Sequence, residues 1–284
     1  ERVEKVREFL PGANCGGCGY PGCDGFAAAI VKEGRDPSGC CVCSQENLQE
    51  IGKIMGKSVN TAERRVARVL CGGDKGKCKN KAEYDGLMDC KAAAVVAGGF
   101  KQCAVGCLGL GTCAKVCPFG AIKVGRGNIA EVDEALCTGC GKCAAECPVH
   151  GIVLMNQKNA TYVACRNQDK GKAVLSVCEA GCIACRLCEK VCPEGAIAME
   201  NNLPVIAYEK CTGCMQCVEK CPRKCIWGDM ENRRGAFVDE IHCTGCETCE
   251  SACKFDAISG EKLQPHHVDP AKCTGCEQCA VACP

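Results

Sequence analysis

Cysteine is the residue type whose spacing along this chain could carry chemistry. Two neighbouring runs each read C-x2-C-x2-C-x3-C-P, and they contain Cys182, Cys185, Cys188, Cys192, Cys211, Cys214, Cys217 and Cys221. In a pair of such runs, three thiolates of one run and the fourth cysteine of the other hold each [4Fe–4S] cluster. The spacing therefore predicts one cluster on Cys182, Cys185, Cys188 and Cys221, and another on Cys211, Cys214, Cys217 and Cys192.

The C-terminal segment repeats this arrangement. Its two runs contain Cys243, Cys246, Cys249 and Cys253, then Cys273, Cys276, Cys279 and Cys283. The same crossing assigns Cys283 to the cluster of the first run and Cys253 to the cluster of the second run. Lys254 stands where the other complete runs have proline, which loosens the turn and keeps every ligand.

An earlier pair of runs is incomplete. Its second run, with Cys137, Cys140, Cys143 and Cys147, is whole and is expected to share a cluster with Cys117. In the first run, Cys107, Cys113 and Cys117 align with Cys182, Cys188 and Cys192, but Leu110 stands in the place of Cys185. The site formed by Cys107, Cys113 and Cys147 therefore lacks a fourth ligand.

Several cysteines near this site could supply the missing ligand. Cys103 is the nearest candidate in sequence, and Cys71, Cys78 and Cys90 are also available. A rescued [4Fe–4S] cluster, a three-cysteine [3Fe–4S] cluster and a lost site are the three alternatives. Rescue is favoured because unattached cysteines are dense in this segment.

The N-terminal segment carries a different pattern, C-x2-C-x4-C-x16-C, formed by Cys15, Cys18, Cys23 and Cys40. The glycines between these cysteines allow the backbone to approach an inorganic core closely. This pattern predicts one more cluster. Cys41 and Cys43 lie beside Cys40; either could replace it as the fourth ligand, but the favoured interpretation is that both are spare thiols. Cys165 and Cys178 are interpreted as structural thiols, and Cys225 has no assigned role.

Composition supports iron–sulfur clusters over other uses of cysteine. The chain has 284 residues and 36 cysteines, but only one Trp, four Tyr and six Phe, so a conventional core is not expected to hold it alone. Disulfides suit short secreted chains, and no signal peptide is visible. Structural zinc usually uses two C-x2-C pairs a dozen or more residues apart rather than three closely spaced cysteines.

Other function classes find little support in the sequence. The chain has 35 basic and 34 acidic residues, so its net charge is close to zero and does not suggest a nucleic-acid partner. No apolar run approaches the roughly 18–20 residues of a membrane span. Neither a dinucleotide-binding G-x-G-x-x-G between a strand and a helix nor a nucleophile–base constellation is present, so no catalytic residue is assigned. About seven clusters without a catalytic site indicate an electron relay.

The elements that position these cysteines are expected to be short. The predicted fold class is α+β, with a small N-terminal [4Fe–4S] domain followed by tandem bacterial-type 2[4Fe–4S] ferredoxin-like modules. The predicted divisions are an N-terminal domain (1–43), a helical connector (44–70), module 1 with a cysteine-rich insert (71–155), module 2 (156–235) and module 3 (236–284). Strands are predicted at 121–124, 203–208 and 236–239, and His266 and His267 are expected to be exposed.

The sequence resembles a known family in two stretches. Asn14-Cys-Gly-Gly-Cys-Gly-Tyr-Pro-Gly-Cys23 with Cys40 is similar to the N-terminal iron–sulfur domain of the B subunits of Rnf complexes. Residues 84–90, Gly98-Gly99 and Cys103-Ala-Val-Gly-Cys107-Leu-Gly-Leu-Gly-Thr-Cys113 resemble the longer clostridial-type members of that family. The resemblance covers residues 10–222, and residues 243–283 extend beyond shorter members as a generic ferredoxin module.

This resemblance implies a subunit of an ion-translocating ferredoxin:NAD⁺ oxidoreductase, a translocase of the cell membrane. The chain would accept electrons from reduced ferredoxin on the cytoplasmic side and relay them to the membrane subunits, with Na⁺ or H⁺ translocated and NAD⁺ as final acceptor. Implied partners are subunits A, C, D, E and G, with an N-terminal membrane helix missing before Glu1. The alternatives are a soluble polyferredoxin, the wiring subunit of a hydrogenase, formate or heterodisulfide enzyme, or a corrinoid-protein partner in methyl transfer.

Overall fold

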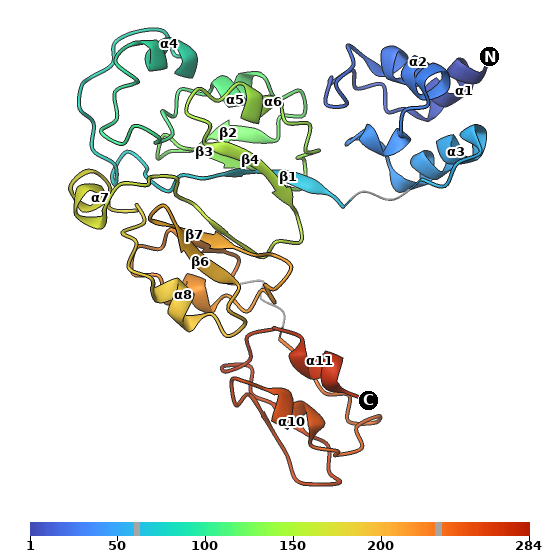
Figure 1. Ribbon diagram of the computed structural model, residues 1–284, viewed down its shortest axis with the longest axis vertical. Coiled ribbons are helices and arrows are strands. Elements are labelled where there is room, and N and C mark those ends of the chain that lie inside the picture. The colour runs from blue at the N-terminus through green and yellow to red at the C-terminus, as the bar shows by residue number, and fades with distance from the viewer. Residues whose placement is uncertain (60–62, 231–234) are drawn as a thin grey trace. The chain divides into compact units, whose positions relative to one another are not determined.

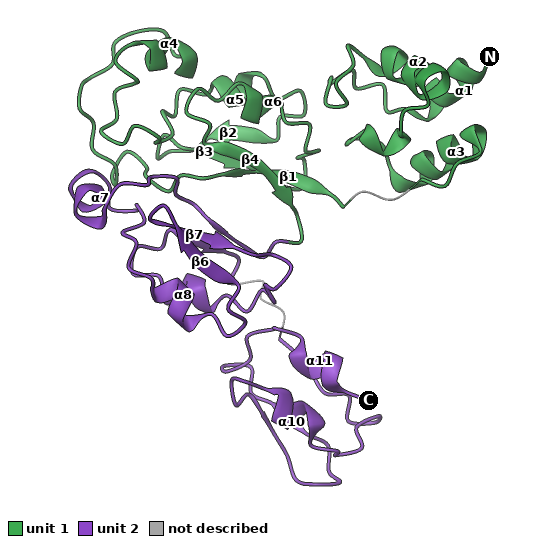
Figure 2. Ribbon diagram, viewed as in Figure 1, with its two compact units in different colours: residues 1–158 green, residues 159–284 purple. Residues whose placement is uncertain are grey.

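Short helices and two-stranded antiparallel sheets carry the cysteine runs in the computed structural model (Figure 1). The structure describes residues 1–59, 63–230 and 235–284. The chain divides into two units, residues 1–158 and 159–284 (Figure 2). Each of the six runs of the C-x2-C-x2-C type places its third cysteine in a helix of one or two turns.

The N-terminal domain is helical. It contains α1 (Arg2–Phe9), α2 (Cys23–Glu33), the 3₁₀ turn η1 (Pro37–Gly39) and α3 (Gln45–Met55). Ser44 caps α3 by accepting a hydrogen bond from the Asn47 N–H, and Gly56 ends it in the left-handed conformation. Ile51 of α3 is fully buried in the same core as Phe26 and Ile30. The predicted connector is therefore wrong as a separate element, since its helix completes the N-terminal core.

Module 1 begins earlier than predicted. It contains β1 (Arg65–Val69), α4 (Cys90–Val95), α5 (Thr112–Lys115), β2 (Ile122–Val124), β3 (Ala130–Val132), α6 (Lys142–Ala145) and β4 (Ile152–Asn156). β1 pairs antiparallel with β4 over five residues, and β2 pairs with β3. The expectation of helix through residues 65–69 is wrong because Val66, Ala67 and Val69 bury their side chains in the core beside β4.

Module 2 repeats this plan. It contains β5 (Thr161–Val163), α7 (Gly171–Val177), α8 (Leu187–Val191), β6 (Ile197–Glu200), β7 (Leu203–Ile206), α9 (Gln216–Glu219) and β8 (Ile226–Gly228). The outer strands β5 and β8 pair over three residues, and β6 pairs with β7. The strands predicted at 121–124 and 203–208 form as β2 and β7, but both are shorter than predicted, and β7 ends at Ile206.

Module 3 has the smallest sheet. It contains α10 (Thr248–Ala252), β9 (Ile258–Ser259), β10 (His267–Val268) and α11 (Gln278–Ala282), and α10 packs against α11. The strand predicted at 236–239 is wrong, because these residues have no regular secondary structure. His266 is buried and only His267 is exposed, so the expectation for His266 is also wrong.

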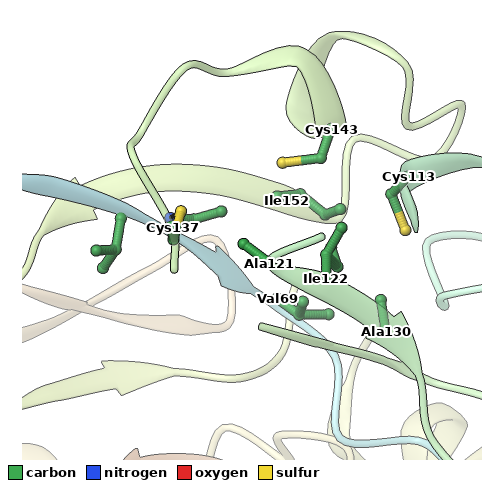
Figure 3. Packing of buried hydrophobic residues seen from close by; sticks show 10 residues of the cluster. Val69, Cys113, Ala121, Ile122, Ala130, Cys137, Cys143 and Ile152 are labelled. Carbon is green, nitrogen blue, oxygen red and sulfur yellow. Dashed lines mark hydrogen bonds between the residues drawn. The ribbon is translucent and has the colours of Figure 1, made fainter. Parts of the chain in front are cut away.

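The core of module 1 mixes aliphatic residues from strands with cysteines from loops (Figure 3). Ile122 of β2 and Ile152 of β4 belong to the same buried cluster as Cys113, Cys137 and Cys143. Side chains alternate between the faces of a strand, so one face of each short strand is directed at this cluster. The strands therefore pack against the cysteine loops and support them from one side.

Candidate iron–sulfur sites

Left-handed backbone turns shape every run of the C-x2-C-x2-C type. The residue before the second cysteine position has positive φ in all six runs: Gly109, Gly139, Ala184, Gly213, Gly245 and Gly275. The residue before the short helix also has positive φ in each run: Gly111, Gly141, Arg186, Met215, Glu247 and Glu277. Such turns are costly for residues other than glycine. Their recurrence shows that the same curled loop is built six times.

In module 2 these loops form two cysteine-lined cavities. One cavity is lined by Cys182, Cys185, Cys188 and Cys221, together with Cys225. The other is lined by Cys192, Cys211, Cys214 and Cys217. Each cavity thus combines three cysteines of one run with the fourth cysteine of the other, which is the crossing that the spacing predicts.

Module 1 has one cavity of the same kind, lined by Cys117, Cys137, Cys140 and Cys143. The remaining cysteines of its two runs, Cys107, Cys113 and Cys147, pack on the core. Leu110 packs elsewhere, against a small apolar cluster that contains Cys90 and Leu108. The structure therefore separates a complete four-cysteine site from an incomplete one.

Module 3 also gathers a crossed set. A wide cavity is lined by Cys243, Cys246, Cys249 and Cys283, together with Cys279 and the buried His266. In the other predicted set, the Cys253 Sγ accepts a hydrogen bond from the Ala257 N–H, and the Cys273 Sγ accepts one from the Ala236 N–H. Cys276 is partly buried. The sequence did not reveal His266 because its burial depends on the pairing of β9 with β10, which brings Gly260 beside the imidazole ring.

The N-terminal pattern also lies in a core. Cys15, Cys23 and Cys40 are buried, and Cys18 is partly buried. The Asn14 side chain holds the loop by accepting a hydrogen bond from the Cys23 N–H at 2.8 Å. The neighbouring thiols differ: a hydrogen bond from Cys43 lowers the pKa of Cys40 to about 6, while burial raises the pKa of Cys41 to about 12. Cys40 is therefore the better metal ligand, because the thiolate binds metal.

Backbone amides stabilise the fourth cysteine of several runs. The N–H four residues further on donates to its sulfur: Gly151 to Cys147 at 3.2 Å and Ala196 to Cys192 at 3.3 Å. In module 2 the corresponding residue after Cys221 is Cys225, whose Sγ lies 3.6 Å from the Cys221 Sγ. This hydrogen bond lowers the pKa of Cys221 to about 5. Sequence spacing alone gave Cys225 no role.

The two spare cysteines Cys71 and Cys165 occupy matching places. The Cys71 Sγ accepts a hydrogen bond from the Cys107 N–H, and the Cys165 Sγ accepts one from the Cys182 N–H, both at 3.4 Å. Cys107 and Cys182 begin the corresponding runs of modules 1 and 2. These paired contacts, with the shared strand order, support a duplication. Of the other spare cysteines, Cys78 and Cys178 are buried and Cys103 is partly buried.

The residues present fit iron–sulfur clusters. No cysteine of the repeated runs forms a disulfide. Burial raises the pKa of Cys143 to about 11 and of Cys217 to about 12, so these thiolates need a compensating cation. Within the described ranges, no group of three or more His, Cys, Asp or Glu side chains is placed to hold a metal ion.

Comparison with known proteins agrees with this chemistry. Family models match an Fe-S cluster domain at residues 10–42, a 4Fe-4S dicluster domain at 181–226 and at 136–196, and a 4Fe-4S binding domain at 236–259 and 266–284. The match at 136–196 joins the second run of module 1 to the first run of module 2. In the structure, the second run of module 1 instead shares its cavity with Cys117, which belongs to the first run of the same module.

Curated relatives decide the family. The B subunit of the ion-translocating oxidoreductase complex from Methanosarcina acetivorans is 44% identical over 79% of this chain and 85% of its own length. The chain belongs to this family. The B subunit of the Na⁺-translocating ferredoxin:NAD⁺ oxidoreductase complex from Acetobacterium woodii is 44% identical over 81% of this chain and 69% of its own. The B subunit of the proton-translocating ferredoxin:NAD⁺ oxidoreductase complex from Clostridium ljungdahlii is 42% identical over 79% of this chain and 80% of its own length.

As a member of the Rnf B family, the chain is an electron-transfer subunit with ferredoxin-type [4Fe–4S] domains, and membership of the complex indicates membrane association. No helix among the residues described here is long and apolar enough to span a bilayer. Among solved structures, a chain of the formate dehydrogenase–heterodisulfide reductase–formylmethanofuran dehydrogenase complex from Methanospirillum hungatei is similar over 63% of this chain and 73% of its own, at 24% identity. Its TM-score of 0.27 is too low for any conclusion.

Proposed function

We propose that this chain is the electron-entry subunit of an Rnf complex, with seven [4Fe–4S] sites. It accepts electrons from reduced ferredoxin on the cytoplasmic side and passes them to the membrane subunits, where their flow to NAD⁺ drives Na⁺ or H⁺ translocation. When bound, such a cluster accepts and releases one electron at a time. The observation that carries the proposal is the cavity lined by a crossed set of four cysteines, which recurs in modules 1, 2 and 3.

The chain's own residues would hold the clusters and set their surroundings. Aliphatic walls such as Ile197 and Ile206 shield the Cys192 cavity from water. Backbone N–H groups donate to ligand sulfurs, which favours the more negative, reduced state. These features adjust the potential of each site, which is the role a protein has in an electron relay.

Exposed ligands provide points of exchange with partners. Cys185 of module 2 and both Cys246 and Cys283 of module 3 are exposed, whereas the other ligands of the Cys185 cavity are wholly or partly buried. An electron enters or leaves most readily where ligand sulfur lies at the surface. We therefore place the contact with reduced ferredoxin at module 3 or at the Cys185 loop.

A rapid-mixing experiment tests this proposal. The anaerobically purified chain is mixed with reduced ferredoxin, and the visible absorbance of its clusters is followed. The proposal predicts bleaching as the clusters are reduced, with rates that depend on ferredoxin concentration. Absence of bleaching in a chain that carries its full iron would contradict electron entry from ferredoxin. Recovery of the full-length protein only in the soluble fraction, without other Rnf subunits, would contradict the membrane assignment.

A further inference from the structure

The incomplete site of module 1 keeps the loop of a cluster site. Gly109 and Gly111 have φ values of +70° and +81°, which match the left-handed turns at Ala184 and Arg186 around Cys185. A Cβ at Gly109 would lie 2.0 Å from the Asn128 carbonyl oxygen, so the loop is packed tightly in this form. The loop is therefore preserved, and only the ligand at position 110 is absent.

Leu110 is in contact with the residues around another cysteine. It packs against a buried cluster formed by Cys90, Ala93 and Leu108. Val149, two residues after Cys147, packs on the same cluster. The side chain that replaces the expected ligand and the segment that follows Cys147 therefore both reach the surroundings of Cys90, which is itself 8% exposed.

One side of Cys90 is tied to Cys113. The Cys90 N–H donates to the Thr112 Oγ1 at 2.7 Å, and the Thr112 hydroxyl donates to the Asp89 Oδ2 at 2.8 Å. Thr112 is buried and directly precedes Cys113. Asp89 also caps α4 by accepting from two backbone N–H groups of its first turn. This network fixes the first residue of α4 beside the helix that carries Cys113.

The residue after Cys90 is tied to the residue before Cys147. Lys91 forms an ion pair with Glu146, which directly precedes Cys147. The residues that flank Cys90 thus bind the residues that precede two ligands of the incomplete site. The segment around Cys90 is thus held against the residues before both Cys113 and Cys147.

Cys103, the nearest candidate in sequence, lies on the Cys107 side of the site, where its carbonyl accepts a hydrogen bond from the Gly106 N–H at 3.1 Å. The Gln102 N–H donates to the Lys79 carbonyl at 2.9 Å, and the buried Lys101 Nζ donates to the Gly73 carbonyl at 2.8 Å. These bonds hold the segment before Cys103 against the loop that contains Cys78. The geometry consequently favours Cys90 over Cys103.

We propose that Cys90 is the fourth ligand of the cluster held by Cys107, Cys113 and Cys147. This inference rests on the proposal that the site holds a [4Fe–4S] cluster. Cys90 supplies from α4 the thiolate that Cys185 supplies within its own run, so the long cysteine-rich insert of module 1 completes the site in place of Leu110.

Iron and sulfide analysis of three variants of the full chain, with EPR spectra, tests the proposal. Cys90→Ala is expected to lose between about one and about four iron atoms, through conversion to a three-iron cluster or loss of the cluster. Cys103→Ala is the matched control and is expected to keep its iron. Cys90→Ala with Leu110→Cys restores the complete run and is expected to recover the iron.

The double variant separates a ligand from a structural residue, because Leu110→Cys would not repair a fold that depends on Cys90. Unchanged iron in Cys90→Ala, or iron loss in Cys103→Ala alone, overturns the inference. Failure of the double variant to recover iron also overturns it. Reduction of the wild-type chain by ferredoxin is measured separately, so the inference about Cys90 and the proposed function can fail independently.

Discussion

Modules 1 and 2 share one plan but differ in how cysteine is used. In both, an inner hairpin and an outer strand pair support two curled loops, and the outer pairs place Val69 opposite Ile152 and Val163 opposite Ile226. Module 1 has Leu110 at a predicted ligand position, and Leu110 packs against a cluster that contains Cys90, a cysteine from an earlier part of the chain. Module 2 has a cysteine at every predicted ligand position and an additional thiol, Cys225. The two modules thus share their strand pairing and differ in the cysteines around it.

The two cores also depend on cysteine to different degrees. The buried cluster of module 1 has ten members, of which three are cysteines. The buried cluster of module 2 has seven members, of which four are cysteines. Because metal binding free energy becomes folding free energy when the ligands form the core, module 2 should depend on iron more than module 1 does.

Removal of iron should have the largest effect and should separate the modules. After anaerobic chelation, we expect amide protection in β5 and β8 to be lost, while β1 and β4, which pair over five residues, keep part of theirs. Hydrogen–deuterium exchange with mass spectrometry measures this difference. Equal loss in both pairs, or greater loss in module 1, would contradict the account.

Loss of a crossed ligand should remove one cluster in each module. Cys192→Ala is expected to lower iron by about four atoms and to disturb the site of Cys211, Cys214 and Cys217, because Cys192 lies in their cavity. Its counterpart, Cys117→Ala, should do the same to the Cys137 site. EPR of the reduced variants identifies the missing signal. The crossing is wrong if Cys192→Ala instead removes the cluster held by Cys182, Cys185 and Cys188.

The outer strands of the two modules are also held by different side-chain contacts, and removing these should change stability less than removing iron or a ligand. Arg68 of β1 is buried and pairs with Glu134, three residues before Cys137. In module 2 the corresponding position before Cys211 is Tyr208, whose hydroxyl donates to the Thr161 carbonyl at 3.1 Å. Glu134→Gln removes the negative charge that faces the buried Arg68 and should lower the free energy of unfolding by about 2 kcal/mol.

Tyr208→Phe removes one neutral hydrogen bond and should cost about 1 kcal/mol. Arg68→Met is the control. Replacing a buried ion by an apolar side chain usually destabilises a fold less than removing the opposite charge beside it. Chemical denaturation of the cluster-loaded chain compares the three variants. A larger loss for Tyr208→Phe than for Glu134→Gln would reverse the predicted order.

The extra thiol of module 2 should change a potential without changing iron content. Cys225 is 2% exposed and lies against Cys221, where module 1 has Gly151 against Cys147. An S–H donor to a ligand sulfur stabilises the reduced cluster, so Cys225→Ala should shift one midpoint potential to a more negative value. An EPR-monitored redox titration measures the shift. Loss of iron would instead identify Cys225 as a ligand.

The crossed sites were predicted from local patterns in the sequence alone. Ligand spacing and left-handed turns depend on a few neighbouring residues, so Cys192 could be assigned with Cys211 before any fold was known. The outer strands were missed because β1 pairs with β4 across most of module 1. Cys90 could be named only as one of four candidates, since its place depends on Thr112 and Glu146.

The most direct test of the central claim is the iron and sulfide content of the chain purified without oxygen. Seven [4Fe–4S] sites, with the Cys107 site completed, predict about 28 iron atoms and an equal amount of sulfide per chain. Redox-titrated EPR should show spin from all seven sites on full reduction. A total near 20 iron atoms in fully folded protein would contradict the ligand assignments.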